Sequence, residues 1–333
     1  MLEIPPLYTL PLAFFTARAG DTRKVSRDSL DQLIAQQVQF VAVQNLDWST
    51  VRRSLFFAYQ HFQYVYPSTV QNLSQRLLVK PQHKYGGQQL LDFKLTVEPI
   101  VLATKVQHDG FGNTMLHLEV AHISHWTSFE VMFCVENTAQ PSNPKILSQQ
   151  LRQFFASTHL TQANPQILEV ARDLQRQSSS PLHFAQRVCD WVYQAMKYKN
   201  GITNVQTTAA QALELGAGLC QDYSHIMLAI CKAGGLSARY VSGHMLGEGG
   251  SHAWVEVLLE NQIGQLEAIG FDPTNARRPN LGYTVVAIGR DYNDVPPTSG
   301  RFIGDSAGVL HFEKFAGLLE LELFDGQIIR PRV

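Results

Sequence analysis

The spacing of apolar residues changes once along this chain of 333 residues, from alternation to a helical period. From about residue 54 to residue 136, runs such as 91–97 and 115–120 alternate apolar and polar side chains, as half-buried strands do. The stretch 137–144, rich in Asn, Thr, Gln, Ser and Pro, is typical of a linker. After it, apolar residues recur every three or four positions, which indicates helices. The pattern therefore predicts an all-β, sandwich-like N-terminal domain followed by a second region that begins with helices.

Turn and cap residues mark where the predicted elements begin. The segment 109–113, with glycines at its second and fourth positions, is typical of a hairpin turn. Asn164 and Ser180 each precede a proline, an arrangement that favours a helix N-terminus. We expect Thr207 to cap a third helix that runs through Leu213.

Composition argues against several classes of function. Apolar residues make up 45% of the chain and charged residues 17%, a balance that suits a folded protein with two cores. The formal net charge is −1, so neither a nucleic acid nor a membrane surface is expected as a partner. The four cysteines, at positions 134, 189, 220 and 231, form no CxxC pair. We therefore expect no metal site, no disulfide framework and no cofactor.

The N-terminal segment argues only weakly for export. Residues 7–19 are fairly apolar and end in a small-residue pattern, but Glu3 stands where a signal peptide has Lys or Arg, and prolines interrupt any helix. We expect a cytoplasmic protein, with secretion as the less favoured alternative. Residues 26–43 have helical spacing and form either a packed helix or an extension with its own partner.

Cys220 differs from the other cysteines in its surroundings. The other three lie in apolar sequence that is typical of buried thiols. Gly216 and Gly218 precede Cys220, and a helix is predicted from there to about Lys232. The glycines permit a tight turn that brings the thiol to the first helical turn, where unpaired N–H groups and the helix dipole favour a thiolate and can hold an oxyanion. A packed structural cysteine explains this segment equally well.

A histidine and an aspartate downstream favour a reactive thiol. Two predicted strands flank a turn at 260–264. If that turn is centred on Gln262, His252 lies directly opposite Asp272, on one face of the sheet and at the roughly 4.5–5.5 Å Cβ separation of cross-strand pairs. A carboxylate so placed can orient an imidazole. A slip of one residue would put the two on opposite faces, so this prediction depends on the turn.

Five sequence blocks in this region resemble the bacterial transglutaminase-like family. They are 218–225 (GLCQDYSH), 238–243 (ARYVSG), 251–256 (SHAWVE), 271–275 (FDPTN) and 289–297 (GRDYNDVPP). The family's N-terminal β-domain is also recognisable, in 64–67, 76–77 and the turn at 109–113. The resemblance covers about residues 60–310. Tyr223 and Ser224 depart from the pattern, since Phe and Ala are commoner there in the family.

The resemblance implies a papain-like α+β core, with Cys220 as nucleophile, His252 as general base and acid, and Asp272 as the orienting acid. It implies acyl transfer on a peptide or protein substrate. Release of the thioester by water would make the chain a cysteine peptidase or amidase, and release by an amine would make it a transglutaminase; we favour water. A binding or scaffold module that has kept the fold without activity is the remaining alternative.

Other residues are given supporting roles. Asp222 is expected to cap the nucleophile helix, and His225 and His244 are expected to be structural. The segment 289–297 is either a loop that supports the site or a purely structural loop with an internal Arg–Asp pair. A second oxyanion donor is sought among three aromatic residues that precede the nucleophile, namely Trp191, Tyr193 and Tyr198.

These observations divide the chain into four predicted parts. It comprises an N-terminal extension of open role (1–50), a β-rich domain (51–140), a transglutaminase-like catalytic domain (141–310), and C-terminal strands with a tail (311–333). The oligomeric state is not indicated by the sequence.

Overall fold

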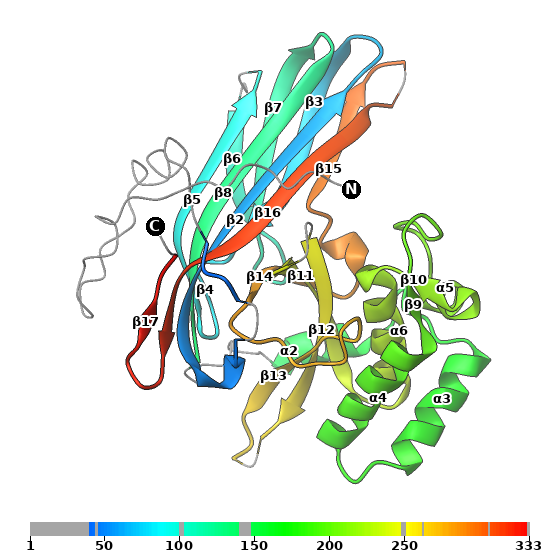
Figure 1. The fold of residues 1–333 in the computed structure, drawn as a ribbon. Helices are drawn as coiled ribbons and strands as arrows, with labels where there is room; N and C mark the ends of the chain where they lie inside the picture. The colour runs from blue at the N-terminus through cyan, green and yellow to red at the C-terminus, as the bar shows by residue number, and fades with distance from the viewer. Residues whose placement is uncertain are drawn as a thin grey trace.

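The computed structural model describes residues 40–43, 46–99, 103–139, 148–247, 251–261, 263–305 and 307–331. The predictions for residues 7–19 and for most of 26–43 lie outside these ranges. The predicted linker (137–144) begins too early, because β8 (Trp126–Thr138) continues into it. Residues 140–144 of that linker also lie outside the described ranges. Figure 1 shows long strands at one end of the molecule and the helices grouped at the other. No helix in the described ranges is long and apolar enough to cross a bilayer.

Two sheets form what we call the β-half, residues 46–139 together with 298–331. The larger sheet has the order β17-β16-β2-β8-β5-β4, and the smaller has the order β15-β3-β7-β6. Their strands are β2 (Val51–Val65), β3 (Val70–Lys80), β4 (Lys84–Tyr85), β5 (Gln88–Glu98), β6 (Ala103–His108), β7 (Thr114–Ile123), β8 (Trp126–Thr138), β15 (Thr298–Ile303), β16 (Val309–Leu323) and β17 (Ile328–Ile329).

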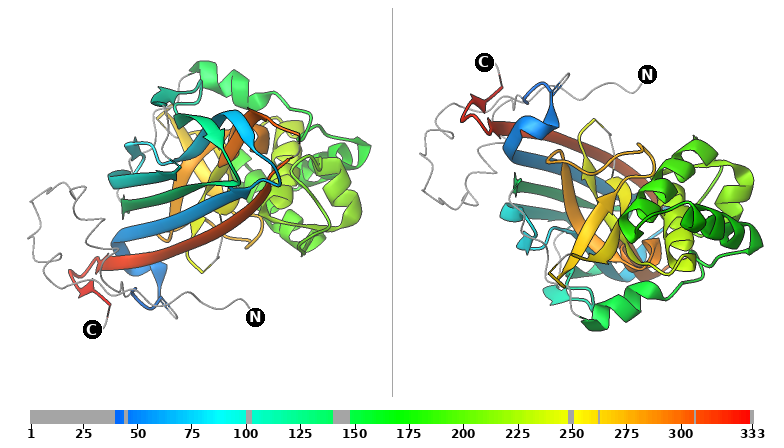
Figure 2. Two further views of the ribbon diagram at one scale, coloured as in Figure 1. Left: turned by 90° about the horizontal axis from the view of Figure 1, so that it is seen from above. Right: turned by 90° about the horizontal axis from the view of Figure 1, so that it is seen from below.

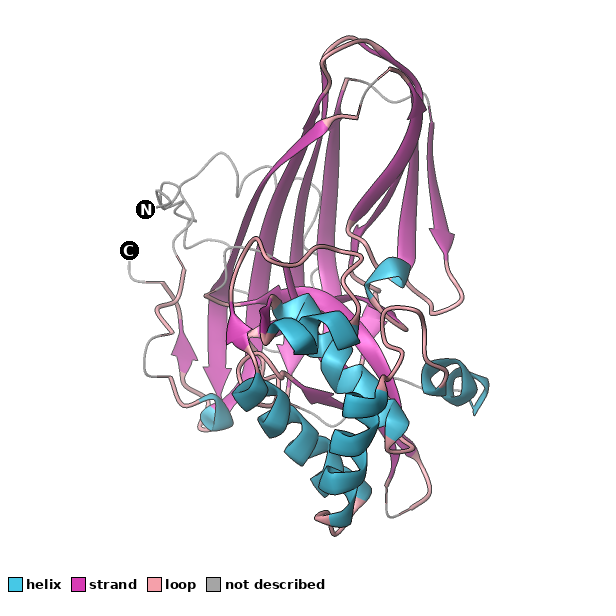
Figure 3. Ribbon diagram, turned by 90° about the vertical axis from the view of Figure 1, so that its right-hand side faces the viewer, coloured by secondary structure: helices cyan, strands magenta, loops and turns pink. Residues whose placement is uncertain are grey.

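Both sheets contribute side chains to one core. Phe56 and Phe133 from the larger sheet are buried with Leu77 and Leu118 from the smaller one. In the smaller sheet, β3 and β7 largely alternate buried and more exposed positions, which is how a strand covers a core with one face. Seen from the side in Figure 3, these strands form the tall part of the molecule, away from the helices. The predicted hairpin at 109–113 is confirmed and joins β6 to β7.

The C-terminal strands return to sheets that the N-terminal part of the chain begins. β16 pairs antiparallel with β2 from Val309 opposite Val65 to Leu323 opposite Val51, and β15 pairs with β3. The boundaries proposed at residues 141 and 310 stay predictions. This pairing nevertheless places residues 298–303, which the predicted division assigns to the catalytic domain, in the same sheet as β3 of the N-terminal part.

The α+β half, residues 148–297, is built around a four-stranded sheet of order β13-β12-β11-β14 with helices packed on it. Its main strands and helices are α2 (Ser148–Phe155), α3 (Pro165–Arg176), α4 (Pro181–Ala195), β9 (Lys197–Tyr198), α5 (Ala209–Leu215), β10 (Ala217–Gly218), α6 (Cys220–Ala233), β11 (Ser237–Met245), β12 (Ser251–Glu260), β13 (Leu266–Phe271) and β14 (Tyr283–Gly289). Figure 2 shows these helices beside the sheet, seen from above and from below. Every residue of α6 from Asp222 to Lys232 is buried, so this helix is central to the core.

The predicted helix caps are mostly confirmed. Asn164 and Ser180 each accept a hydrogen bond from the backbone N–H three residues on, with proline at the first helical position. The cap predicted at Thr207 is wrong by one residue. Thr208 caps α5, because its hydroxyl and the Gln211 side chain bond each other's backbone N–H groups in a capping box.

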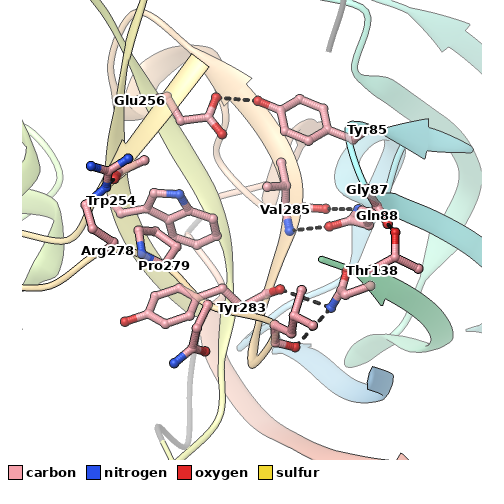
Figure 4. Close-up of a pocket in the computed structure, with 14 residues that line it drawn as sticks. Tyr85, Gly87, Gln88, Thr138, Trp254, Glu256, Arg278, Pro279, Tyr283 and Val285 are labelled. Carbon is pink, nitrogen blue, oxygen red and sulfur yellow. Dashed lines mark hydrogen bonds between the residues drawn. The ribbon is translucent and has the colours of Figure 1, made fainter. Parts of the chain in front are cut away.

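The two halves meet at β14, the edge strand of the α+β sheet. Gln88 bonds both backbone groups of Val285, at 2.8 and 2.7 Å, as Figure 4 shows. Asn113 does the same for Ile288, at 2.7 and 2.8 Å. A sheet edge leaves unpaired N–H and C=O groups, and a buried edge needs partners for them. Amide side chains of the β-half therefore complete the hydrogen bonding of the α+β sheet.

Candidate active site

The nucleophile loop is held by glycines, as the sequence predicts. Gly216 ends α5 with a φ of 60°, a left-handed conformation that favours glycine. Gly218 lies in β10, which pairs with β9, and a Cβ placed there would lie 2.4 Å from an oxygen of Asp222. Only glycine fits that contact without displacing the carboxylate. The chain then enters α6 with Cys220 as its first residue.

Asp222 caps this helix, and that prediction is confirmed. Its Oδ2 accepts the Leu219 N–H at 2.7 Å and the Thr203 hydroxyl at 2.7 Å. Burial raises the pKa of Asp222, although both hydrogen bonds act to lower it. A carboxylate in the first turn also interacts favourably with the helix dipole. The result is a fixed start for α6 and hence a fixed position for the thiol.

Cys220 is the half-buried thiol of the four, and none of the four forms a disulfide. Burial raises the pKa of Cys189 to about 12, and it raises the pKa values of Cys134 and Cys231 further. Those three thiols are therefore protonated and enclosed. Cys220 is the one that a reagent or a substrate can reach.

His252 and Asp272 are brought together directly. The imidazole Nε2 lies 2.8 Å from Asp272 Oδ2, and both side chains are fully buried. Because a carboxylate only accepts hydrogen bonds, Nε2 carries the proton and Nδ1 carries the lone pair of the neutral ring. Trp254 stacks near the imidazole, with ring centroids 6.2 Å apart.

The predicted register that led to this pair is wrong by two residues. β12 and β13 pair Val255 with Phe271 and Glu260 with Leu266, so the turn is centred on Ile263 and not on Gln262, which is outside the described residues. Asp272 lies one residue beyond the last of these pairs. A shift of two residues keeps the same face of each strand, so the side chains still meet.

Three further groups hold the Asp272 carboxylate. Oδ2 also accepts from Asn275 Nδ2 at 2.8 Å and from the Tyr283 hydroxyl at 2.7 Å, and Oδ1 accepts the Thr274 N–H at 3.0 Å. Burial alone would raise the pKa of Asp272, but its bonds to His252, Asn275 and Tyr283 outweigh burial and hold that pKa below its usual range. The carboxylate is thus ionised and immobile. Asn275 lies in the FDPTN block, whereas no sequence signal pointed to Tyr283.

Cys220 lies at the end of α6 that packs against the core shared with β11 and β12. Tyr240 on β11 is buried, and burial followed by the negative charge of a Cys220 thiolate raises the pKa of its phenol. Lys314 on β16 also lies close enough for that charge to act on its pKa. The thiol therefore lies where the start of α6 packs on the core that this helix shares with β11 and β12.

The histidines expected to be structural are buried. His225 Nε2 accepts the Tyr292 N–H at 3.2 Å, and burial lowers the pKa values of His225 and His244 to about 3. The loop 289–297 contains the predicted Arg–Asp pair, with Arg290 Nε 2.9 Å from Asp294 Oδ2. Because Tyr292 bonds a histidine of the nucleophile helix, this loop also contacts α6.

The three aromatic candidates for an oxyanion donor are separated by the fold. Tyr198 lies in β9 and pairs with Gly218, which is two residues before Cys220 in sequence. Trp191 packs against the core from α4, and Tyr193 on the same helix is exposed.

In the described ranges, no three His, Cys, Asp or Glu side chains are grouped as metal ligands.

Comparison with known proteins agrees with this architecture. Residues 168–266 match the transglutaminase-like superfamily, and residues 59–136 match the bacterial transglutaminase-like N-terminal region. The chain therefore carries a transglutaminase-like core preceded by a bacterial transglutaminase-like N-terminal region.

Its relatives include an uncharacterised protein of Mycobacterium tuberculosis, 27% identical over 72% of this chain and 84% of that protein. One from Mycobacterium leprae is 29% identical over 45% of this chain and 55% of that protein. Among solved structures, a candidate cysteine protease from Cytophaga hutchinsonii matches with a TM-score of 0.65 at 20% identity, over 79% of this chain and 91% of that chain. This likeness shows a shared fold.

Proposed function

We propose that this chain is a cysteine peptidase or amidase that cleaves peptide amide bonds, with Cys220 as nucleophile, His252 as general base and acid, and Asp272 as the orienting acid. The observation that carries the proposal is the buried His252–Asp272 hydrogen bond of 2.8 Å. A histidine oriented by a buried carboxylate is what a nucleophilic thiol needs as its proton acceptor. The half-buried position of Cys220 at the start of α6 supports the same roles.

The reaction proceeds in two steps. The Cys220 thiolate attacks the carbonyl carbon, the C–N bond breaks, and protonated His252 gives its proton to the leaving amine. A thioester remains on the enzyme. His252 then takes a proton from water, the resulting hydroxide attacks the thioester, and the C–S bond breaks to release the acid and restore the thiolate.

An oxyanion forms in both steps and needs hydrogen-bond donors. Backbone N–H groups in the first turn of α6 are suited to this role. Of the aromatic candidates we favour Tyr198, because its pairing opposite Gly218 fixes it close to the nucleophile loop. Its side chain is 51% exposed, so a substrate can reach the phenol.

Water is the acceptor that we favour over an amine. The protein from Cytophaga hutchinsonii described as a candidate cysteine protease is consistent with hydrolysis. The choice is decided by giving the enzyme a peptide substrate with and without a primary amine. Acid product in both reactions supports a peptidase, and an amine-substituted product supports a transglutaminase.

The test of the nucleophile compares two cysteine variants. Cys220→Ala should lower turnover of peptide-library substrates by about a thousandfold or more, because no other group can form the thioester. Cys134→Ala, a buried thiol of the β-half, should retain activity. Iodoacetamide should label Cys220 before the three buried thiols, as mass spectrometry of the digested protein would show. Activity retained by Cys220→Ala would end the proposal, as would equal labelling of all four cysteines.

A further inference from the structure

A lysine of the β-half reaches into the candidate active site. Lys314 lies on β16, the C-terminal strand that pairs with β2. Its Nζ donates to the hydroxyl of Ser251 at 3.0 Å. Ser251 is the first residue of β12 and immediately precedes His252. The cation therefore comes from a strand outside the two matched family regions and contacts the residue that precedes the candidate general base in sequence.

The surroundings of Lys314 are aromatic. Its Nζ lies 5.2 Å from the ring centroid of Phe62 and 5.4 Å from that of Phe312, distances at which an ammonium is attracted to a ring. Burial lowers the pKa of Lys314 to about 8, and the negative charge of Cys220 acts in the opposite direction. The ammonium is thus charged at pH 7. Phe312 is 59% exposed, so solvent reaches this site from one side.

Lys314 differs from two arginines that are paired with carboxylates. Arg239 is paired with Glu256, and Arg53 is paired with Glu136 and Glu320. Among the residues that the structure describes, no carboxylate lies within ion-pair distance of Lys314. An ammonium has three donors, and the Ser251 hydroxyl takes one of them. A half-buried cation without an anion is partly desolvated, so an arriving carboxylate would be bound favourably.

We propose that Lys314 is a specificity residue that binds a carboxylate of the substrate next to the scissile carbonyl, while exposed Phe312 contacts the adjoining apolar part. This rests on the proposed function, since the substrate is taken to be a peptide. The carboxylate belongs either to a Glu or Asp side chain or to a free C-terminus. Lys314 can take part in substrate selection, because its hydrogen bond to Ser251 uses one of three N–H donors and leaves two for a ligand.

Binding without turnover tests the proposal independently of catalysis. The full chain carrying Cys220→Ala is applied to a peptide array in which each sequence occurs with Glu or Asp, with Gln or Asn, and with a free or amidated C-terminus. We expect carboxylate-bearing peptides to be bound at least tenfold more tightly than their amides. The side-chain and C-terminal sets distinguish the two sources. The added substitution Lys314→Met should abolish the preference. No preference, or one that survives Lys314→Met, overturns the proposal.

Turnover provides the second measurement, on the otherwise wild-type chain. Lys314→Met should lower kcat/KM about tenfold for carboxylate peptides and leave amide peptides unchanged. Lys314→Arg should keep most of the preference, and Lys105→Met, an exposed lysine of β6, should keep all of it. Equal losses on all peptides, with slower iodoacetamide labelling of Cys220, would mean that Lys314 serves the thiolate and would overturn the proposal. Thermal unfolding checks that each variant is folded.

The two measurements separate the proposal from the proposed function. If Cys220→Ala binds carboxylate peptides through Lys314 and the wild-type chain cleaves none of them, the peptidase proposal fails and the lysine site stands. If the wild-type chain cleaves peptides equally well with and without a carboxylate, the peptidase proposal stands and the proposal for Lys314 fails.

Discussion

The two halves of the molecule position polar groups in different ways. In the α+β half, the polar groups of the candidate site are held by partners within that half, some of them near neighbours in sequence. Asp222 bonds Leu219, and Asn275 bonds Asp272, each three residues away. At the junction, partners come from far along the chain, since Lys314 of the β-half bonds Ser251. The β-half is therefore part of the architecture of the site and not a separate attachment.

Ion pairs show the same contrast. At the junction, Arg239 and Glu256 have side chains only 2% and 9% exposed, and Tyr85 of the β-half bonds both of them. Within the β-half, Arg52 and Glu322 form a pair whose side chains are 53% and 22% exposed. Removing one member of a buried pair leaves an uncompensated charge, whereas an exposed charge is solvated by water.

The largest expected effect of this contrast is on stability. Arg239→Met should lower the free energy of unfolding by about 3–5 kcal/mol, because Glu256 is then buried without its cation. Arg52→Met should lower it by less than about 1 kcal/mol. Urea unfolding of both variants at pH 7 measures the difference. The double variant Arg239→Met and Glu256→Leu should regain part of the loss. Equal costs for the two arginine variants would show that the junction pair contributes no more than a surface pair.

Acid should weaken the α+β half through two buried histidines. His225 and His244 have pKa values lowered to about 3, against about 6.5 in the unfolded chain. Between these values the unfolded chain binds protons that the folded chain does not, so stability is complete above pH 6.5 and falls as the pH falls towards 3. The loss from pH 8 to pH 5 is roughly 2 kcal/mol for each histidine.

Urea unfolding at pH 8 and pH 5 measures this loss. His225→Gln should make the stability less dependent on pH, and the Gln side chain can still accept the Tyr292 N–H. His122→Gln, at an exposed position of β7, should leave the dependence unchanged. The contrast between the halves would be broken if the two variants had the same effect.

The features that could be predicted from sequence are those determined locally. Helix starts at Pro165, Pro181 and Cys220 depend on residues within one turn, and so does the cap by Asp222. The predicted register of β12 and β13 was wrong because the side chain of Asn261 accepts the N–H groups of Ile263 and Gln265. These bonds centre the loop one residue further along the chain than predicted.

The features that could not be predicted depend on tertiary structure. Tyr283 bonds Asp272 and Lys314 bonds Ser251, yet each lies in an ordinary strand sequence. Nothing in the pattern around them indicates that Tyr283 lies beside a buried carboxylate or that Lys314 reaches Ser251. Alternation predicts which face of a strand is buried, but the partner across that face depends on the packing of the two halves.

The smallest expected effect concerns Tyr283, which links Asp272 to the junction. Its hydroxyl donates to Asp272 Oδ2 at 2.7 Å and accepts from Arg277 Nε at 2.7 Å. Burial and then the charge of Asp272 raise the pKa of Tyr283 well above its usual range, so the phenol stays protonated. Tyr283→Phe removes one of three donors to that oxygen. The carboxylate keeps its bonds to His252 and Asn275 and should lose only part of its orienting effect.

We expect Tyr283→Phe to lower kcat/KM about tenfold, an effect of about 1.4 kcal/mol, which is close to the lower end of the range of about 1.5–3 kcal/mol for a hydrogen bond to a charged group. The pH profile should shift as well, because Asp272 with fewer donors has a higher pKa and its ionisation requires a higher pH. Tyr59→Phe removes a hydroxyl that donates to Glu130 within the β-half and should change neither quantity. If Tyr283→Phe lowered stability but left the rate and the pH profile unchanged, Tyr283 would be only a packing residue of the junction. Near neighbours in sequence and His252 would then suffice to hold Asp272, and the site would depend less on the junction than the contrast between the halves implies.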